Sequence, residues 1–106
     1  MSENRAEARI RLDNIEQNYR YLRQKAGENC IVMAVVKADA YGHGAVEVCR
    51  RLSAAGETHF AVACMEEAAL LRSSGIAGEL LVLGITPQEL YGSIAAYNVV
   101  QTVASY

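Results

Sequence analysis

The stretch that decides the fold reads Cys30-Ile31-Val32-Met33-Ala34-Val35-Val36, and all of its residues are apolar. Branched side chains and this length are typical of a β-strand covered on both faces, as the strands of parallel sheets are. Counting by two along the strand places Lys37 on the same face as Met33 and Val35. The stretch therefore predicts a buried strand that leads directly into a lysine.

Short apolar runs alternate with segments of helical spacing along the rest of the chain. After a loop at Ala38–Gly44, the expected elements are helix Ala45–Ala55, strand Phe60–Ala63, helix Met65–Ser74, strand Leu80–Leu83, helix Pro87–Tyr97 and strand Val99–Ala104. Gly56 and Gly75 are placed to end the first two helices. Thr86 and Glu89 around Pro87 read as a capping box that begins the third.

Upstream, a weak strand is expected at Ala8–Leu12, followed by a helix that Asp13 caps and that ends near Gly27. These segments give an α/β chain of about five parallel strands and four helices. Such units suggest either an open doubly wound sheet or a (β/α)8 barrel. Because a barrel takes roughly 250 residues, the 106 residues here supply about half of one.

The last expected strand has no helix after it, which suggests one domain that continues beyond Tyr106. A half barrel leaves strand edges unpaired, so we expect the isolated chain to dimerise, swap or aggregate.

Composition excludes several classes of protein. The chain is 52% hydrophobic and 21% charged, with a formal net charge of -2 and scattered basic residues, so nucleic acid is not an expected partner. The charge-free segment Leu90–Tyr106 is too short and too polar to span a membrane. The N-terminus lacks the apolar run of a secretion signal, so a cytoplasmic location is expected.

The cysteines predict neither a disulfide nor a metal site. Cys30, Cys49 and Cys64 are odd in number and lie 19 and 15 positions apart, with no histidine at ligand spacing. We expect all three to be reduced and inert, with Cys49 packed as a small hydrophobe.

Lys37 is the residue best placed for chemistry. Active sites of α/β folds lie at the carboxyl ends of parallel strands, where Lys37 is expected. Apolar walls there favour the neutral amine, which is the form that attacks a carbonyl. The alternative is a solvated lysine that only ends a strand.

The run Val35-Val36-Lys37-Ala38-Asp39-Ala40-Tyr41-Gly42-His43-Gly44 resembles the pyridoxal phosphate attachment motif of alanine racemases. The segments 9–23, 60–68, 81–84 and 100–105 continue the resemblance, which covers about Ala8 to Tyr106. The resemblance implies the front part of a partial (β/α)8 TIM-type barrel, with a C-terminal β domain elsewhere. It also implies pyridoxal 5'-phosphate as cofactor and L- and D-alanine as substrates, feeding D-alanine into bacterial peptidoglycan.

The resemblance also implies roles for single residues. Lys37 would be the Schiff-base lysine and one of two opposed acid/base groups. Tyr41 would contact the cofactor phosphate, and Leu83 would lie near the pyridine ring; packing roles remain the alternative for both. No catalytic role is carried over to His43, and no metal is implied. Cys64 stands in place of the family's usual Ser or Thr helix cap.

Other functional groups of the family lie beyond Tyr106, including the opposing tyrosine, which a partner subunit of a homodimer supplies. The segment alone is therefore expected to be inactive. A serine or serine/alanine racemase remains a close alternative. An alternative of another class is a pyridoxal phosphate carrier, although carriers normally lack the run 39–44. A structural half-barrel module is a third possibility.

Overall fold

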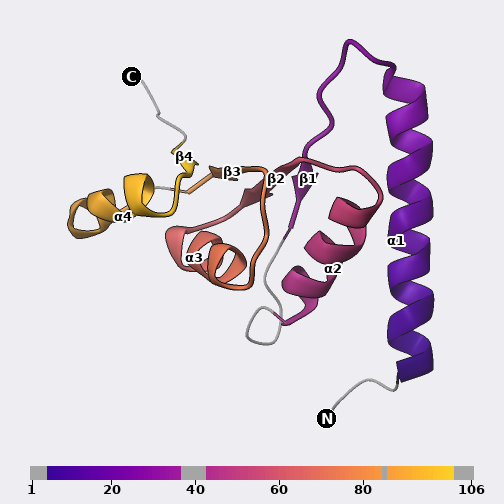
Figure 1. Ribbon diagram of the computed structural model, residues 1–106, viewed down its shortest axis with the longest axis horizontal. Helices are drawn as coiled ribbons and strands as arrows, with labels where there is room; N and C mark the ends of the chain where they lie inside the picture. The colour runs from indigo at the N-terminus through magenta and orange to yellow at the C-terminus, as the bar shows by residue number, and fades with distance from the viewer. Residues whose placement is uncertain (1–4, 37–42, 85, 102–106) are drawn as a thin grey trace.

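The computed structural model describes residues 5–36, 43–84 and 86–101, and shows helices alternating with strands of one sheet (Figure 1). In chain order the elements are α1 (Arg5–Ala26), β1 (Ala34–Val35), α2 (His43–Ala54), β2 (His59–Val62), α3 (Met65–Ser73), β3 (Glu79–Val82), the 3-10 helix η2 (Gln88–Leu90), α4 (Tyr91–Ala96) and β4 (Val100–Gln101). This order confirms the α/β class.

The strands are parallel and follow one another in the order β1-β2-β3-β4. One row of paired residues runs across the sheet from Val35 through Ala61 and Leu81 to Val100. Because side chains alternate along a strand, this row and its neighbours point to opposite faces. The register therefore gives the sheet a helix-covered face and an open face.

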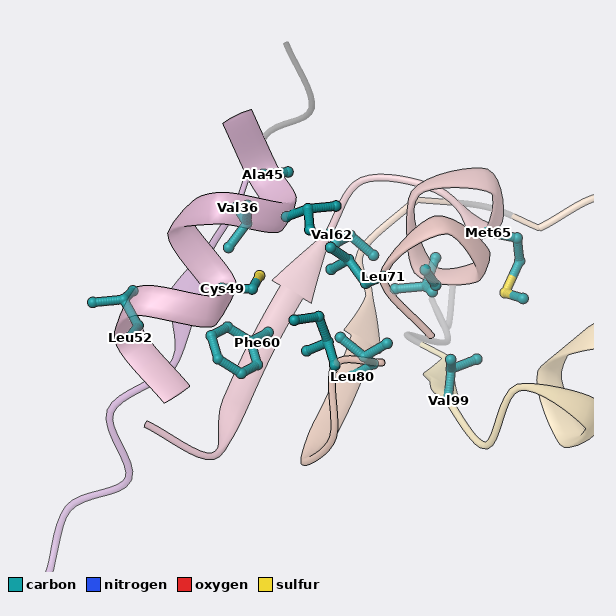
Figure 2. Packing of buried hydrophobic residues seen from close by; sticks show 14 of the residues in the cluster. Val36, Ala45, Cys49, Leu52, Phe60, Val62, Met65, Leu71, Leu80 and Val99 are labelled. Carbon is teal, nitrogen blue, oxygen red and sulfur yellow. The ribbon is translucent and has the colours of Figure 1, made fainter. Parts of the chain in front are cut away.

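The core lies between the sheet and the helices on one of its faces. Phe60, Val62, Leu80 and Val82 are at most 1% exposed. Figure 2 shows Phe60 and Leu80 close to each other, with Cys49 of α2 above them. Burial of these side chains, each contributing about 1.5–3 kcal/mol, holds the helices on the sheet.

The opposite face of the sheet is apolar and largely exposed within the described residues. Val35, Leu83 and Val100 are 61%, 47% and 49% exposed, and Ile31 and Met33 before β1 are exposed as well. Ala61 is buried because its larger neighbours in the row flank its short side chain. This open face corresponds to the side that a closed barrel turns toward its axis.

The strand predicted at Ala8–Leu12 is wrong, because these residues belong to the 22-residue helix α1. Arginine, alanine, glutamate and leucine are strong helix formers, and the segment has no strand to pair with among the described residues. The helix predicted after Asp13 is present as the second part of α1, but the capping role predicted for Asp13 is wrong, because the helix already begins at Arg5. Tyr19 of this part is buried against the core. Leu22, three residues after Tyr19, is exposed.

The strand predicted at Cys30–Val36 is shorter and less covered than expected. Pairing with β2 gives β1 only Ala34 and Val35, because β2 itself begins at His59. The prediction that the strand is covered on both faces is wrong within this chain: Val36 is buried, whereas Val35 is open.

The helix predicted at Pro87–Tyr97 begins after Pro87, and its first turn is a 3-10 helix. Pro87 has an extended ψ of 146°, so the first turn is the 3-10 helix η2 and α4 starts at Tyr91. The capping role of Thr86 is wrong, because its hydroxyl donates a hydrogen bond to Gln101 Oε1. The strand predicted at Val99–Ala104 is observed as β4 at Val100–Gln101; Val99 lies just before it, and residues 102–104 lie outside the described residues.

The other predicted elements are confirmed with small shifts at their ends. Helices α2 and α3 match the expected segments, and Gly56 and Gly75 end them with positive φ angles of 109° and 87°. Cys64 caps α3 without a side-chain hydrogen bond, as expected for a thiol.

Candidate functional site

The carboxyl ends of three strands meet in register at one edge of the sheet. The amide of Val36 donates to Ala61 O at 2.8 Å, and that of Leu83 donates to Val62 O at 2.8 Å. The amide of Gly84 donates to Ala63 O at 2.9 Å. Main-chain pairing therefore continues beyond β1, β2 and β3 and gives this edge a fixed backbone.

The predicted lysine site begins at this edge. Lys37 directly follows Val36, which is 5% exposed and paired to β2. Lys37 and Tyr41 themselves lie outside the described residues, as does Asp39. The chain is described again from His43, where α2 begins with no acidic residue in its first turn. The positive end of that helix dipole suits an anion such as a phosphate.

Leu83 is brought to the same edge on the open face of the sheet. Val82, one residue before it, is fully buried on the helix-covered face, whereas Leu83 is 47% exposed. A core role for Leu83 is therefore wrong within this chain. Its exposed apolar side chain suits contact with a flat aromatic ring.

Gly84 and Gln101 belong to this edge, and the sequence analysis did not single them out. A Cβ on Gly84 would collide with the carbonyl oxygen of Ala63, so only glycine allows the chain after β3 to approach β2. The Gln101 amide donates to Gly84 O at 2.7 Å and to Val82 O at 3.4 Å. The signal for Gln101 was present as a polar residue within an apolar strand.

His59 does not add a catalytic group to this edge. His59 begins β2 at the opposite, amino end of the strands, where its Nδ1 lies 2.9 Å from Thr58 Oγ1. The described ranges contain no cluster of three His, Cys, Asp or Glu side chains that could hold a metal ion. No helix in these ranges is long and apolar enough to cross a bilayer.

The parallel sheet, the helices on one face and the site at the carboxyl edge define a chain of the (β/α)-barrel class. A family model described as "Alanine racemase, N-terminal domain" matches residues 10–106. The chain belongs to this family of alanine racemase N-terminal domains.

Individual relatives agree with this assignment. "Alanine racemase 1" of Clostridium acetobutylicum is 46% identical over 93% of this chain and 25% of its own length. An "Amino-acid racemase" of Enterococcus faecalis is 41% identical over 95% of this chain and 14% of its own. The solved alanine racemase of Clostridium difficile 630 superposes with a TM-score of 0.80 at 38% identity, covering 89% of this chain and 25% of that one. The chain thus spans about a quarter of the alanine racemases it matches.

Proposed function

We propose that this chain is the N-terminal portion of a pyridoxal phosphate-dependent racemase that interconverts L- and D-alanine. The observation that carries the proposal is the meeting of two motif segments at one sheet edge. Val36, which leads into Lys37, and Leu83 directly follow β1 and β3, and both of these strands pair with β2. Membership of the alanine racemase family supports the same reaction.

The described part of this edge fits the proposed cofactor. An exposed apolar side chain, Leu83, lies on the open face, where an aromatic ring can rest on it. The first turn of α2 carries no carboxylate that would repel a phosphate. When bound, pyridoxal phosphate supplies an electron-withdrawing ring that stabilises negative charge at the substrate α-carbon.

Three residues of the chain hold the cofactor in this proposal. The amine of Lys37 would hold the aldehyde end of the cofactor, the Tyr41 hydroxyl would donate a hydrogen bond to its phosphate, and Leu83 would pack against its ring. Lys37 Nζ also removes or returns the α-proton on one side of the substrate. An amine accepts a proton only when neutral, so this role requires the neutral form of Lys37.

The second acid/base group, which acts on the opposite side of the substrate, comes from outside these 106 residues. We therefore propose that the segment alone is inactive and that the active protein is a cytoplasmic homodimer. Its product would supply D-alanine for bacterial peptidoglycan.

The test uses the intact protein that carries this chain. D-alanine formed from L-alanine is measured with a coupled D-amino-acid oxidase, and the visible absorption of added pyridoxal phosphate is recorded. We expect Lys37→Ala to abolish both the racemisation and the lysine-dependent absorption band. Racemisation that persists in Lys37→Ala would overturn the proposed role of Lys37.

The amino acid that is racemised needs its own test, because the Enterococcus faecalis relative bears the broader name "Amino-acid racemase". Racemisation of L-serine faster than L-alanine would favour the serine or serine/alanine racemase. Cofactor binding without racemisation of either amino acid would favour a carrier of pyridoxal phosphate.

A further inference from the structure

The carbonyl groups of the residues before and after Leu83 accept hydrogen bonds from one side chain, that of Gln101. Its Nε2 donates to Gly84 O at 2.7 Å and to Val82 O at 3.4 Å. These two carbonyls flank Leu83 in the chain. Gln101 thus reaches from β4 to the backbone that carries Leu83.

The other side of the same backbone is held by β2. The amides of Leu83 and Gly84 donate to Val62 O and Ala63 O at 2.8 and 2.9 Å. Because Gly84 has no room for a Cβ, the backbone after β3 lies close against the end of β2. Leu83 is therefore fixed from two directions, by main chain on one side and by an amide side chain on the other.

Thr86 determines which end of the Gln101 amide faces Leu83. The Thr86 hydroxyl donates to Oε1, and Thr86 is itself 6% exposed. With Oε1 occupied by this donor, Nε2 faces the two carbonyls. A carboxylate of the same shape would keep the contact with Thr86 but would bring an acceptor toward carbonyl oxygens.

Gln101 does not share the open face with Leu83. Gln101 pairs with Val82, whose side chain is buried on the helix-covered face, whereas Leu83 is exposed on the opposite face. The Gln101 amide therefore supports the backbone of Leu83 from the helix-covered face and does not line the site on the open face.

We propose that Gln101, oriented by Thr86, is a positioning residue that sets where Leu83 meets the cofactor ring. The proposal rests on the proposed function, because it requires that the ring lies on Leu83. Through Leu83, Gln101 controls cofactor affinity and the orientation of the bound ring. Misplacement by about 1 Å in such a site can cost about a hundredfold.

The experiment compares variants of the intact protein after removal and re-addition of pyridoxal phosphate. The cofactor dissociation constant is measured by titration, and the circular dichroism of its visible band reports ring orientation. We expect Gln101→Glu and Leu83→Ala each to weaken binding by about tenfold or more and to change this dichroism. Thr86→Val, which retains the Gln101 amide, should give a smaller change of the same sign.

A double variant of Gln101 and Leu83 distinguishes a positioning role of Gln101 from a general loss of stability. Once Leu83 is shortened, Gln101→Ala should add little, so the double variant should bind about as the Leu83→Ala variant does. Arg72→Lys is the matched control, because Arg72 contacts loops away from this edge and its loss lowers stability alone. It should lower the melting temperature and leave the dichroic band unchanged.

Each outcome has one meaning. Unchanged cofactor affinity and dichroism in Thr86→Val and Gln101→Ala, with Leu83→Ala altered, would overturn the role of Gln101. If Gln101→Glu does not fold, the cofactor affinity and dichroism of Thr86→Val and Gln101→Ala test the role of Gln101. A visible cofactor band that is unchanged in Lys37→Ala would instead contradict the proposed function.

Discussion

At the scale of single residues, Arg72 shows how one side chain holds several loops. Its guanidinium donates to Tyr97 O and Asn98 O at 2.9 and 3.0 Å, and to Ile76 O and Gly78 O at 2.9 and 2.7 Å. The first two carbonyls follow α4, and the last two precede β3. Arg72 therefore connects the approach to β3 with the approach to β4.

Replacing Arg72 by alanine should lower the free energy of unfolding by about 2–3 kcal/mol, because several charge-assisted hydrogen bonds are lost together. Lysine should restore less than half of this, since one ammonium cannot span four carbonyls. Urea denaturation measures both values. Arg50→Lys is the control, because the contacts of Arg50, a hydrogen bond to Ser74 O and an ion pair with Glu47, are both exposed. Equal stability of the Arg72 lysine variant and the parent would contradict this account.

Cys49 is fully buried on α2, and burial raises the pKa of its thiol to about 11. Alkylating agents react with thiolates, so iodoacetamide at pH 8 should leave Cys49 unmodified in the folded protein. Cys30, which is exposed, should react under the same conditions. Peptide mapping after a short pulse measures both sites, and a repeat in denaturant should label them equally. Rapid labelling of Cys49 in the native protein would show that its burial is transient.

At the scale of elements, α1 is joined to α2 by an ion-pair network. Arg51 of α2 lies 2.7 Å from Asp13 and 3.3 Å from Glu16, and Glu16 also pairs with Arg20 at 2.8 Å. Hydrogen bonds from Arg20 and then Arg51 lower the pKa of Glu16 below its ordinary value of 4.5. The network therefore depends on an ionised Glu16.

A group whose pKa is depressed by folding stabilises the protein above its unfolded-state pKa and loses this effect as the pH falls. We expect Glu16→Gln to be less stable than the parent at pH 7. The difference should shrink as the pH falls below 4.5 through the folded-state pKa. Chemical denaturation across this range measures it, and 1 M salt should reduce it by screening. Glu47→Gln, at an exposed pair with Arg50, is the control and should change the stability little at pH 7.

Most elements could be predicted because local patterns determine them. The short apolar runs Phe60–Val62 and Leu80–Val82, and the helix ends at Gly56 and Gly75, agree with the structure. The structure of Ala8–Leu12 could not be predicted, because its alternating apolar residues also occur in a helix built from residues of high helix propensity. At the site, the motif predicted Lys37, whereas Gly84 and Gln101 depend on contacts between strands that local patterns do not contain.

At the scale of the whole molecule, the sheet has helices on one face and exposed apolar side chains on the other. Val35, Leu83 and Val100 form this open face together with Ile31 and Met33. Contiguous apolar surface of this kind marks an interface or an aggregation hazard. Edge strands β1 and β4 add unpaired backbone on the described part of the sheet.

The 106-residue chain alone should therefore self-associate, and the double variant Val35→Lys, Val100→Lys should do so less. Sedimentation velocity at several concentrations measures this. In the intact protein the same variant should fail to fold, because the lysines would be buried in the barrel. Tyr91→Lys, at an exposed position of α4, should be tolerated in both settings. A monomeric parent chain at all concentrations would contradict the expected association.

The order of the strands in the sheet is also their order in the chain. They begin at Ala34, His59, Glu79 and Val100, so each is 20 to 25 residues from its partner (59 − 34 = 25, 79 − 59 = 20, 100 − 79 = 21). During synthesis, every new strand that leaves the ribosome finds its pairing edge already made. Assembly can thus keep pace with translation, one β-α unit at a time, with short loop closures at each step.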